Sequence, residues 1–281
     1  MELKIASLTR LMHTIRLSSI VALVLSVTAS TAAAETLMMP NRDMLMGTSE
    51  VVWGITTLPD GAATTYTINF GDGVTTAPAA VTDRSYIALN HTYALSGVYT
   101  ATLTVMNGAT TQTATVTLNV YNSALLSAFD LRNLNVNRSI QDGLRYLWYS
   151  QSNRTTFDTN IETAWGNYVN PFTALAVLAF ENHGYRLPNS NAVPVGIYPK
   201  YAVRRGFNYV LARMTTLTIG VTPGGNDPCL SVPAPVCSAL SAQTTGDPGY
   251  ENGIALLPFA ASGALSRTVT EVAAANVSGK S

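Results

Sequence analysis

Between residues 51 and 121 the hydrophobic positions repeat at every second residue. In 99–105 apolar residues alternate with threonines, and in 113–121 they alternate with Thr113, Thr115 and Thr117. A strand that buries one face and exposes the other has this period. Asn107 and Gly108 separate the two segments and tolerate the backbone of a tight turn. The pattern therefore predicts a hairpin here and, with short strand patterns upstream, an all-β sandwich.

From Arg138 onward the hydrophobic period lengthens to that of a helix. In the first helical segment, Ile140, Leu144, Leu147 and Trp148 are spaced as one stripe, which predicts that this stripe is buried. The expected helices cover residues 139–151, 171–184, 202–214 and a segment from about 250 to 263. The first aligns with the third and the second with the fourth. The pattern thus predicts two copies of a helix pair, as in a solenoid or a closed toroid.

Motifs in the strand-rich part resemble those of the PKD (polycystic kidney disease) domain. They are INFGDG at 68–73 and HTYALSGVYTATLTV at 91–105. The resemblance implies an immunoglobulin-like sandwich over residues 37–121. Such domains serve as spacers or as protein- and carbohydrate-contact modules. We interpret Asp72, between two glycines, as a turn residue, and His91 and Tyr93 as packing and hydrogen-bonding residues.

The helix pairs resemble the repeats of prenyltransferase and terpene-cyclase α/α toroids. The motifs are G-L-x-Y-L at 143–147 and T-A-L-A-V-L-A-F at 173–180. The resemblance implies that residues 138–281 form toroid-like helical repeats after a linker at 122–137. A complete toroid needs more pairs than two, so we expect this chain to be a truncated piece of a longer protein. The fold class expected overall is a β-sandwich followed by all-α helical-hairpin repeats.

The N-terminus has the order of a secretory signal peptide. Basic residues precede an apolar stretch at 20–27, and small residues then end in an A-x-A site at Ala32 and Ala34. The apolar stretch is well short of the about 20 residues that span a bilayer. We therefore expect cleavage of residues 1–34 before Glu35, with no stable membrane span in the mature protein. The expected location is secreted, periplasmic or on the cell surface.

Charge is scarce and balanced along the chain. Only 11% of the residues are charged, against about 25% in an average soluble domain. Sixteen Lys and Arg residues balance sixteen Asp and Glu residues. No net charge therefore attracts nucleic acid or holds the protein on an anionic membrane. With 47% apolar residues, the chain can bury a substantial core, which excludes wholesale disorder.

The two cysteines, Cys229 and Cys237, lie close together in a segment rich in proline and serine. In an oxidising compartment this spacing favours a local disulfide, with free thiols as the alternative. No histidine lies near them in sequence to complete a zinc site. They are therefore candidates for a disulfide and not for a metal centre.

Candidates for chemistry are few. Asp158 and Glu162, at i and i+4, would share a helix face as an acid/base pair, whereas solvated surface carboxylates are the alternative. Asp227 and Asp247 lie in a long loop and are candidate ligand contacts, with calcium as the only cofactor considered. Neither pair has the spacing of a known metal motif. We therefore expect no catalytic, cofactor or metal residues, apart from these weak candidates.

Two functions agree with these features. The first is a secreted or cell-surface, non-catalytic binding or structural protein, whose PKD-like module presents the helical region to a protein or carbohydrate partner. The alternative is an extracellular enzyme with an active site in the toroid cavity, acting on a glycan or isoprenoid-type substrate. Its catalytic residues would lie outside this chain, and fold-level analogy alone supports it.

Overall fold

A computed structural model describes most of the chain. The described residues are 34–159, 161–167, 169–188, 192–218, 225, 238–241 and 248–263. The expected signal peptide therefore lies outside the described residues, apart from Ala34. Among the described helices, none is long and apolar enough to cross a membrane.

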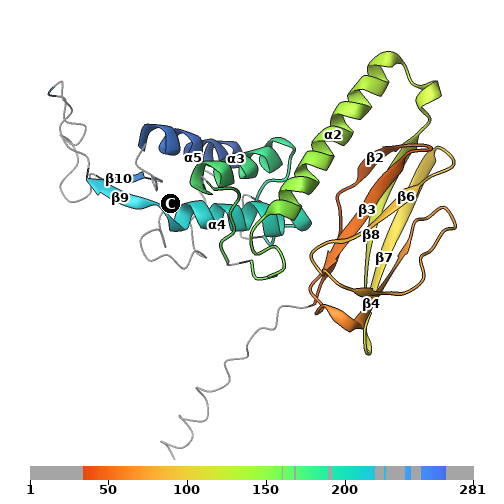
Figure 1. The fold of residues 1–281 in the computed structure, drawn as a ribbon. Coiled ribbons are helices and arrows are strands. Elements are labelled where there is room, and N and C mark those ends of the chain that lie inside the picture. Colours follow the sequence, from red (N-terminus) through yellow and green to blue (C-terminus); the bar gives the residue numbers. More distant parts are fainter. Residues whose placement is uncertain are drawn as a thin grey trace, which may run out of the picture. The chain divides into compact units, whose positions relative to one another are not determined.

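Residues 36–121 form a β-sandwich of two sheets (Figure 1). One sheet has the strand order β1-β3-β6, and the other has the order β2-β8-β7-β4-β5. All neighbours are antiparallel except β2 and β8, which are parallel. The strands are β1 Thr36–Met38, β2 Arg42–Leu45, β3 Ser49–Thr56, β4 Gly61–Asn69, β5 Ala79–Val81, β6 Ile87–Thr92, β7 Gly97–Asn107 and β8 Thr110–Tyr121.

The hairpin predicted from the alternating pattern is formed by β7 and β8. Asn107 pairs with Thr110, so Gly108 and Ala109 make the turn, and Gly108 has a positive φ of 55°. On the inner face of β7, Ala101, Leu103 and Val105 are fully buried, while the intervening threonines are partly exposed. The two-residue period therefore selects the core face of this sheet as predicted.

The first helix, α2, spans Ala128–Ser150 and begins earlier than the sequence pattern indicated. A short 3₁₀ helix, η1, covers Ser123–Leu125 within the segment that was expected to be a linker. The Ser127 hydroxyl caps α2 by accepting a hydrogen bond from the backbone N–H of Asp130 at 3.1 Å. The first half of α2 buries only Leu134, so its hydrophobic pattern is too weak to reveal a helix.

Four α-helices make up the described helical region, together with one π-helix. After α2 come α3 at Val169–Asn182, the π-helix η2 at Tyr198–Val203, α4 at Arg204–Ala212 and α5 at Pro248–Ser262. Strands β9 at Thr215–Thr218 and β10 at Ser238–Ser241 pair antiparallel. Helix α3 contacts both α4 and α5. The predicted helices therefore exist, but the described residues show a small helical region and no series of toroid repeats.

The sandwich and the helical region share one hydrophobic core. A single cluster of buried side chains runs from the sandwich into α2, α3 and η2. Trp53 of β3 lies with its ring centroid 6.3 Å from that of Trp148 on α2 and 6.0 Å from that of Tyr198 on η2. The two parts therefore pack directly on each other, unlike modules joined by a free linker.

Candidate functional site

The FGDG turn of the sandwich is held by its own hydrogen bonds. Asp72 Oδ1 accepts from the backbone N–H of Val74 at 3.1 Å, and Asp72 Oδ2 lies 2.7 Å from His91 Nε2. The His91 ring stacks on Phe70 with centroids 3.9 Å apart, and the hydroxyl of Tyr93 donates to the Phe70 carbonyl at 2.9 Å. Burial alone raises the pKa of Asp72, but these hydrogen bonds and the His91 charge lower it overall. The contacts give all of these side chains structural roles.

Charged side chains cross the junction between the sandwich and α2. Arg42 of β2 lies 3.1 Å from the carboxylate of Glu50 and 2.9 Å from that of Asp142, and Arg138 lies 2.8 Å from Glu50. Arg42 and Glu50 are both almost fully buried. Burial alone raises the pKa of Asp142, but Arg42 and Arg145 lower it overall. Removing one partner would leave a buried charge uncompensated, so this network fixes how α2 lies on the sandwich.

A narrow cavity lies in the same junction. It is lined by Met39, Pro40, Arg42, Trp53, Gln141, Leu144, Tyr185 and Tyr198. The cavity volume is about 10 Å³, which holds about one water molecule. Within the described part of the chain, Arg42 Nε and Gln141 Oε1 are buried without a hydrogen-bond partner. This volume suits a structural water and is too small for an organic ligand.

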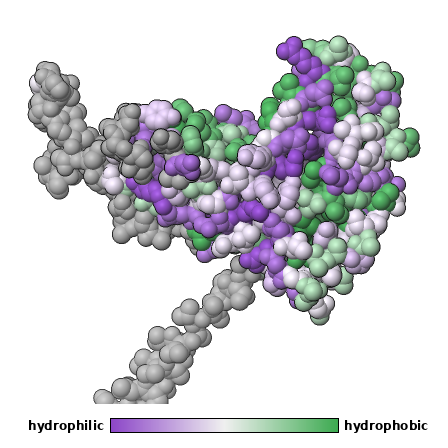
Figure 2. Space-filling model, viewed as in Figure 1, coloured by the Kyte–Doolittle hydropathy of each residue, from purple (hydrophilic) through white to green (hydrophobic). Residues whose placement is uncertain are grey.

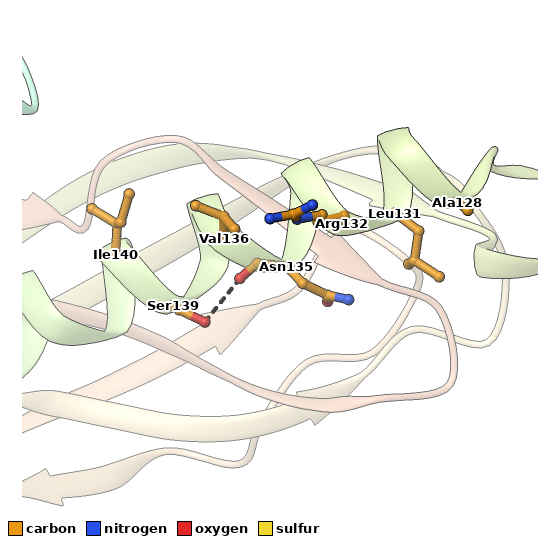
Figure 3. A pocket seen from close by; sticks show the side chains of 7 residues that line it. All are labelled: Ala128, Leu131, Arg132, Asn135, Val136, Ser139 and Ile140. Carbon is orange, nitrogen blue, oxygen red and sulfur yellow. Dashed lines mark hydrogen bonds between the residues drawn. The ribbon is translucent and has the colours of Figure 1, made fainter.

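An open surface runs along the first half of α2. The open groove on this surface has a volume of about 720 Å³. It is lined by Ala128, Leu131, Arg132, Asn135, Val136, Ser139 and Ile140. Val136 and Ile140 point to the same side, and the Ser139 hydroxyl donates to the Asn135 carbonyl at 2.8 Å (Figure 3). Ile140, which the periodicity placed on the buried stripe, is 42% exposed.

Further apolar side chains extend this surface toward the start of the helix. Leu125 is 80% exposed and Phe129 is 72% exposed. Over the area where α2 runs, exposed apolar residues lie among polar ones (Figure 2). Leu125 belongs to η1 and not to α2. We call the side chains of Phe129, Val136 and Ile140 the α2 face. Large exposed apolar residues grouped on one helix face are typical of an interaction surface.

Asp158 and Glu162 do not share a helix face. Both lie in the irregular segment between α2 and α3. Glu162 forms an ion pair with Arg213, which follows α4. The charge of Asp158 raises the pKa of the Arg205 guanidinium. Burial has the larger effect and lowers the pKa of Arg205 to about 10. The i, i+4 spacing therefore lies outside a helix, and the acid/base pair stays a prediction. The other candidates, Asp227, Asp247, Cys229 and Cys237, lie outside the described residues.

Sequence reasoning missed one unusual carboxyl group, that of Glu181. It lies near the end of α3 and is fully buried, and neither carboxyl oxygen has a hydrogen-bond partner among the residues that the structure describes. Burial raises the pKa of Glu181 to about 8, opposed in part by the charge of Arg186. The signal that could have revealed it is a glutamate among the apolar residues of a helix expected to be buried. Among the described residues, no three His, Cys, Asp or Glu side chains cluster to hold a metal.

Residues 41–121 match the family model of the PKD domain. No curated protein matches the chain. Three solved structures are similar to it, each with a TM-score of 0.25. They are the M1 domain from titin (14% identity, 31% of this chain and 94% of that chain), the PKD domain from human KIAA0319 (13%, 34% and 87%) and the sulfur carrier protein SoxY from Chlorobium limicola (17%, 32% and 81%). From similarities at this TM-score we draw nothing; the PKD assignment comes from the family match.

Proposed function

We propose, from the PKD domain at residues 41–121, that this protein is an exported, non-catalytic binding protein. PKD domains are typical of extracellular and cell-surface proteins. The charged, apolar and small residues of the N-terminus, in that order, support export by a cleaved signal peptide. In an oxidising compartment Cys229 and Cys237 then form the proposed local disulfide.

The observation that carries the binding function is the α2 face. Its side chains recur at helical spacing along about three turns of α2, and the second half of the same helix packs into the core shared with the sandwich. An apolar stripe on a fixed helix is complementary to the apolar side of another amphipathic helix. We therefore take the partner to be a protein that contributes such a helix.

Site-specific photocrosslinking tests this function in cells that produce the full chain. A photoreactive residue at Val136 is expected to crosslink to an amphipathic helical segment of a surface protein, identified by peptide mapping. Ile140→Asp should abolish the adduct, because a charge on the stripe must be desolvated on binding. The matched control is a photoreactive residue at Val98, 72% exposed on the sandwich.

Three outcomes would contradict this proposal. They are equal adducts at Val136 and Val98, an adduct that survives Ile140→Asp, and an adduct only with a second copy of this chain. A glycan array probed with the mature protein covers the carbohydrate alternative. Specific glycan binding that Ile140→Asp leaves unchanged would transfer the binding function to another surface.

The toroid remains part of the proposal. Helices α3 and α5 correspond to each other in the two expected helix pairs, and they pack together. Direct packing of corresponding helices supports a repeated arrangement. Further helix pairs of the same kind would extend it.

The alternative function is an extracellular enzyme acting on a glycan or isoprenoid-type substrate. One observation favours it: the buried carboxyl group of Glu181 accepts no hydrogen bond from the described residues, and its pKa of about 8 would let it hold a proton at neutral pH and release it. A positioned nucleophile or second carboxylate beside it is not visible in the described residues. The binding function therefore has the stronger support.

A further inference from the structure

Glu35 joins the edge of the sandwich to the helical region. Its backbone N–H donates to Thr57 Oγ1 at 2.6 Å, and its carbonyl accepts from the Thr57 N–H at 2.8 Å. These bonds continue the β1–β3 pairing past Thr36, which is paired with Thr56. The backbone of Glu35 is therefore fixed as part of the sheet edge.

The side chain of Glu35 reaches the π-helix η2. Its Oε2 lies 2.5 Å from Lys200 Nζ and accepts a hydrogen bond from the Tyr201 hydroxyl at 2.9 Å. Burial raises the pKa of Tyr201, and the nearby Glu35 carboxylate raises it further, so the hydroxyl stays protonated as a donor. The ion pair is only partly exposed, with 29% of the Glu35 side chain and 19% of the Lys200 side chain accessible. One residue thus connects two segments that are distant in sequence.

Glu35 is the first described residue that is bonded into the sheet edge. Ala34 itself is exposed. The A-x-A site in the sequence ends at Ala34.

We propose that processing between Ala34 and Glu35 makes Glu35 a terminal clamp. A peptidase of the export machinery adds water across this peptide bond, leaving a carboxylate on Ala34 and an α-ammonium on Glu35. The new ammonium lies where the amide nitrogen lay and donates to Thr57 Oγ1. The carboxylate of the same residue binds Lys200 and Tyr201, so the mature N-terminus fastens η2 to the sandwich. This inference rests on the proposed export.

The mature terminus is tested first, on full-length precursor produced in an exporting bacterial host. Intact mass and N-terminal sequencing of the exported protein should give Glu35 as the first residue. An exported protein that begins elsewhere or keeps residues 1–34 would overturn the clamp and leave the binding function standing. Failure of the chain to be exported would instead contradict the proposed function itself.

The clamp is tested by amide hydrogen exchange of the exported mature protein. Glu35→Ala and Lys200→Met should each speed exchange at residues 198–203 by about fivefold, because a partly buried pair is lost. The double variant should exchange no faster than either single variant, since both changes remove one interaction. Thr57→Val should speed exchange along β1, where the ammonium is held.

A matched pair within the helical region serves as control. Glu162→Gln breaks the ion pair with Arg213, which does not reach the sandwich, and should leave exchange at 198–203 unchanged. Wild-type exchange in Glu35→Ala, or additive effects in the double variant, would overturn the clamp. So would an equal response to Glu162→Gln.

Discussion

At the scale of single residues, Glu181 stands apart from the other described carboxylates. The buried Glu50 meets two arginines, and Asp72 meets His91, so each of these charges has a partner. The Glu181 side chain is fully buried, and its two carboxyl oxygens accept no hydrogen bond from any described residue. Desolvation disfavours its charged form, which means that the folded protein binds the proton more tightly than the unfolded chain. Stability must then depend on pH through this residue.

We expect the free energy of unfolding to fall as the pH rises from about 4.5 to about 8, the ordinary and the raised pKa of Glu181. The slope for one proton is at most about 1.4 kcal/mol per pH unit. Glu181→Gln should remove this dependence and be more stable than the wild type at pH values above 8. Urea unfolding across this pH range measures it.

Glu162→Gln is the control, because Glu162 is 37% exposed and paired with Arg213. It should keep the wild-type pH dependence. The expectation for Glu181 fails if the Gln variant follows the same pH curve as the wild type.

At the scale of elements, the two expected repeat copies share a glycine whose surroundings differ between the copies. Gly143 on α2 aligns with Gly206 on α4. A Cβ at Gly143 would meet nothing within 4 Å, whereas one at Gly206 would overlap Val177 Cγ2 of α3 and lie 3.2 Å from Trp165 Cζ3. Gly206 therefore permits the close approach of α3 and α4, while Gly143 only weakens α2.

Alanine substitutions at these positions should have opposite effects. Gly206→Ala is expected to lower the free energy of unfolding by about 1–3 kcal/mol, because a packed core must shift. Gly143→Ala should raise it by about 0.5–1 kcal/mol through helix propensity. Chemical denaturation of the two variants measures both signs. A gain in stability for Gly206→Ala would show that α3 and α4 are not in close contact.

At the scale of the whole molecule, the sandwich and the helices unfold together if they share a core. Trp148 is the centre of that contact: it is fully buried, stacks with Trp53, and its indole N–H donates to the Ser85 carbonyl at 2.9 Å. The ion pairs of Arg42 with Asp142 and of Glu35 with Lys200 also join the sandwich to the helical region. The second half of α2 is therefore held against the sandwich and anchors the helix that carries the proposed α2 face.

Trp148→Ala should lower the free energy of unfolding by about 3–5 kcal/mol, the usual range for a large buried ring. Calorimetry of the mature wild type should show one transition, and the variant should shift the sandwich and the helices together. Trp148→Phe, which keeps a ring but loses the indole N–H, should be affected less. A sandwich transition that stays at the wild-type temperature in Trp148→Ala would show that the two parts are independent.

The sequence by itself determined the sandwich and the existence of the helices. The two-residue period chose the core side of β7 and β8, and the turn glycines marked where strands reverse, because these features depend on neighbouring residues. The sequence also gave Asp72 its role in a turn.

Only the tertiary structure decided what the helices bury and what they expose. The spacing placed Ile140 with Leu144 and Trp148, yet the sandwich covers only part of α2, so Ile140 stays exposed while the other two are buried. Asp158 and Glu162 are near in sequence but lack the helix that would pair them. The contacts of Glu35 with Lys200, and the isolation of Glu181, join or separate residues far apart in the chain. Periodicity reports local geometry, whereas burial and pairing depend on which distant surface packs against each element.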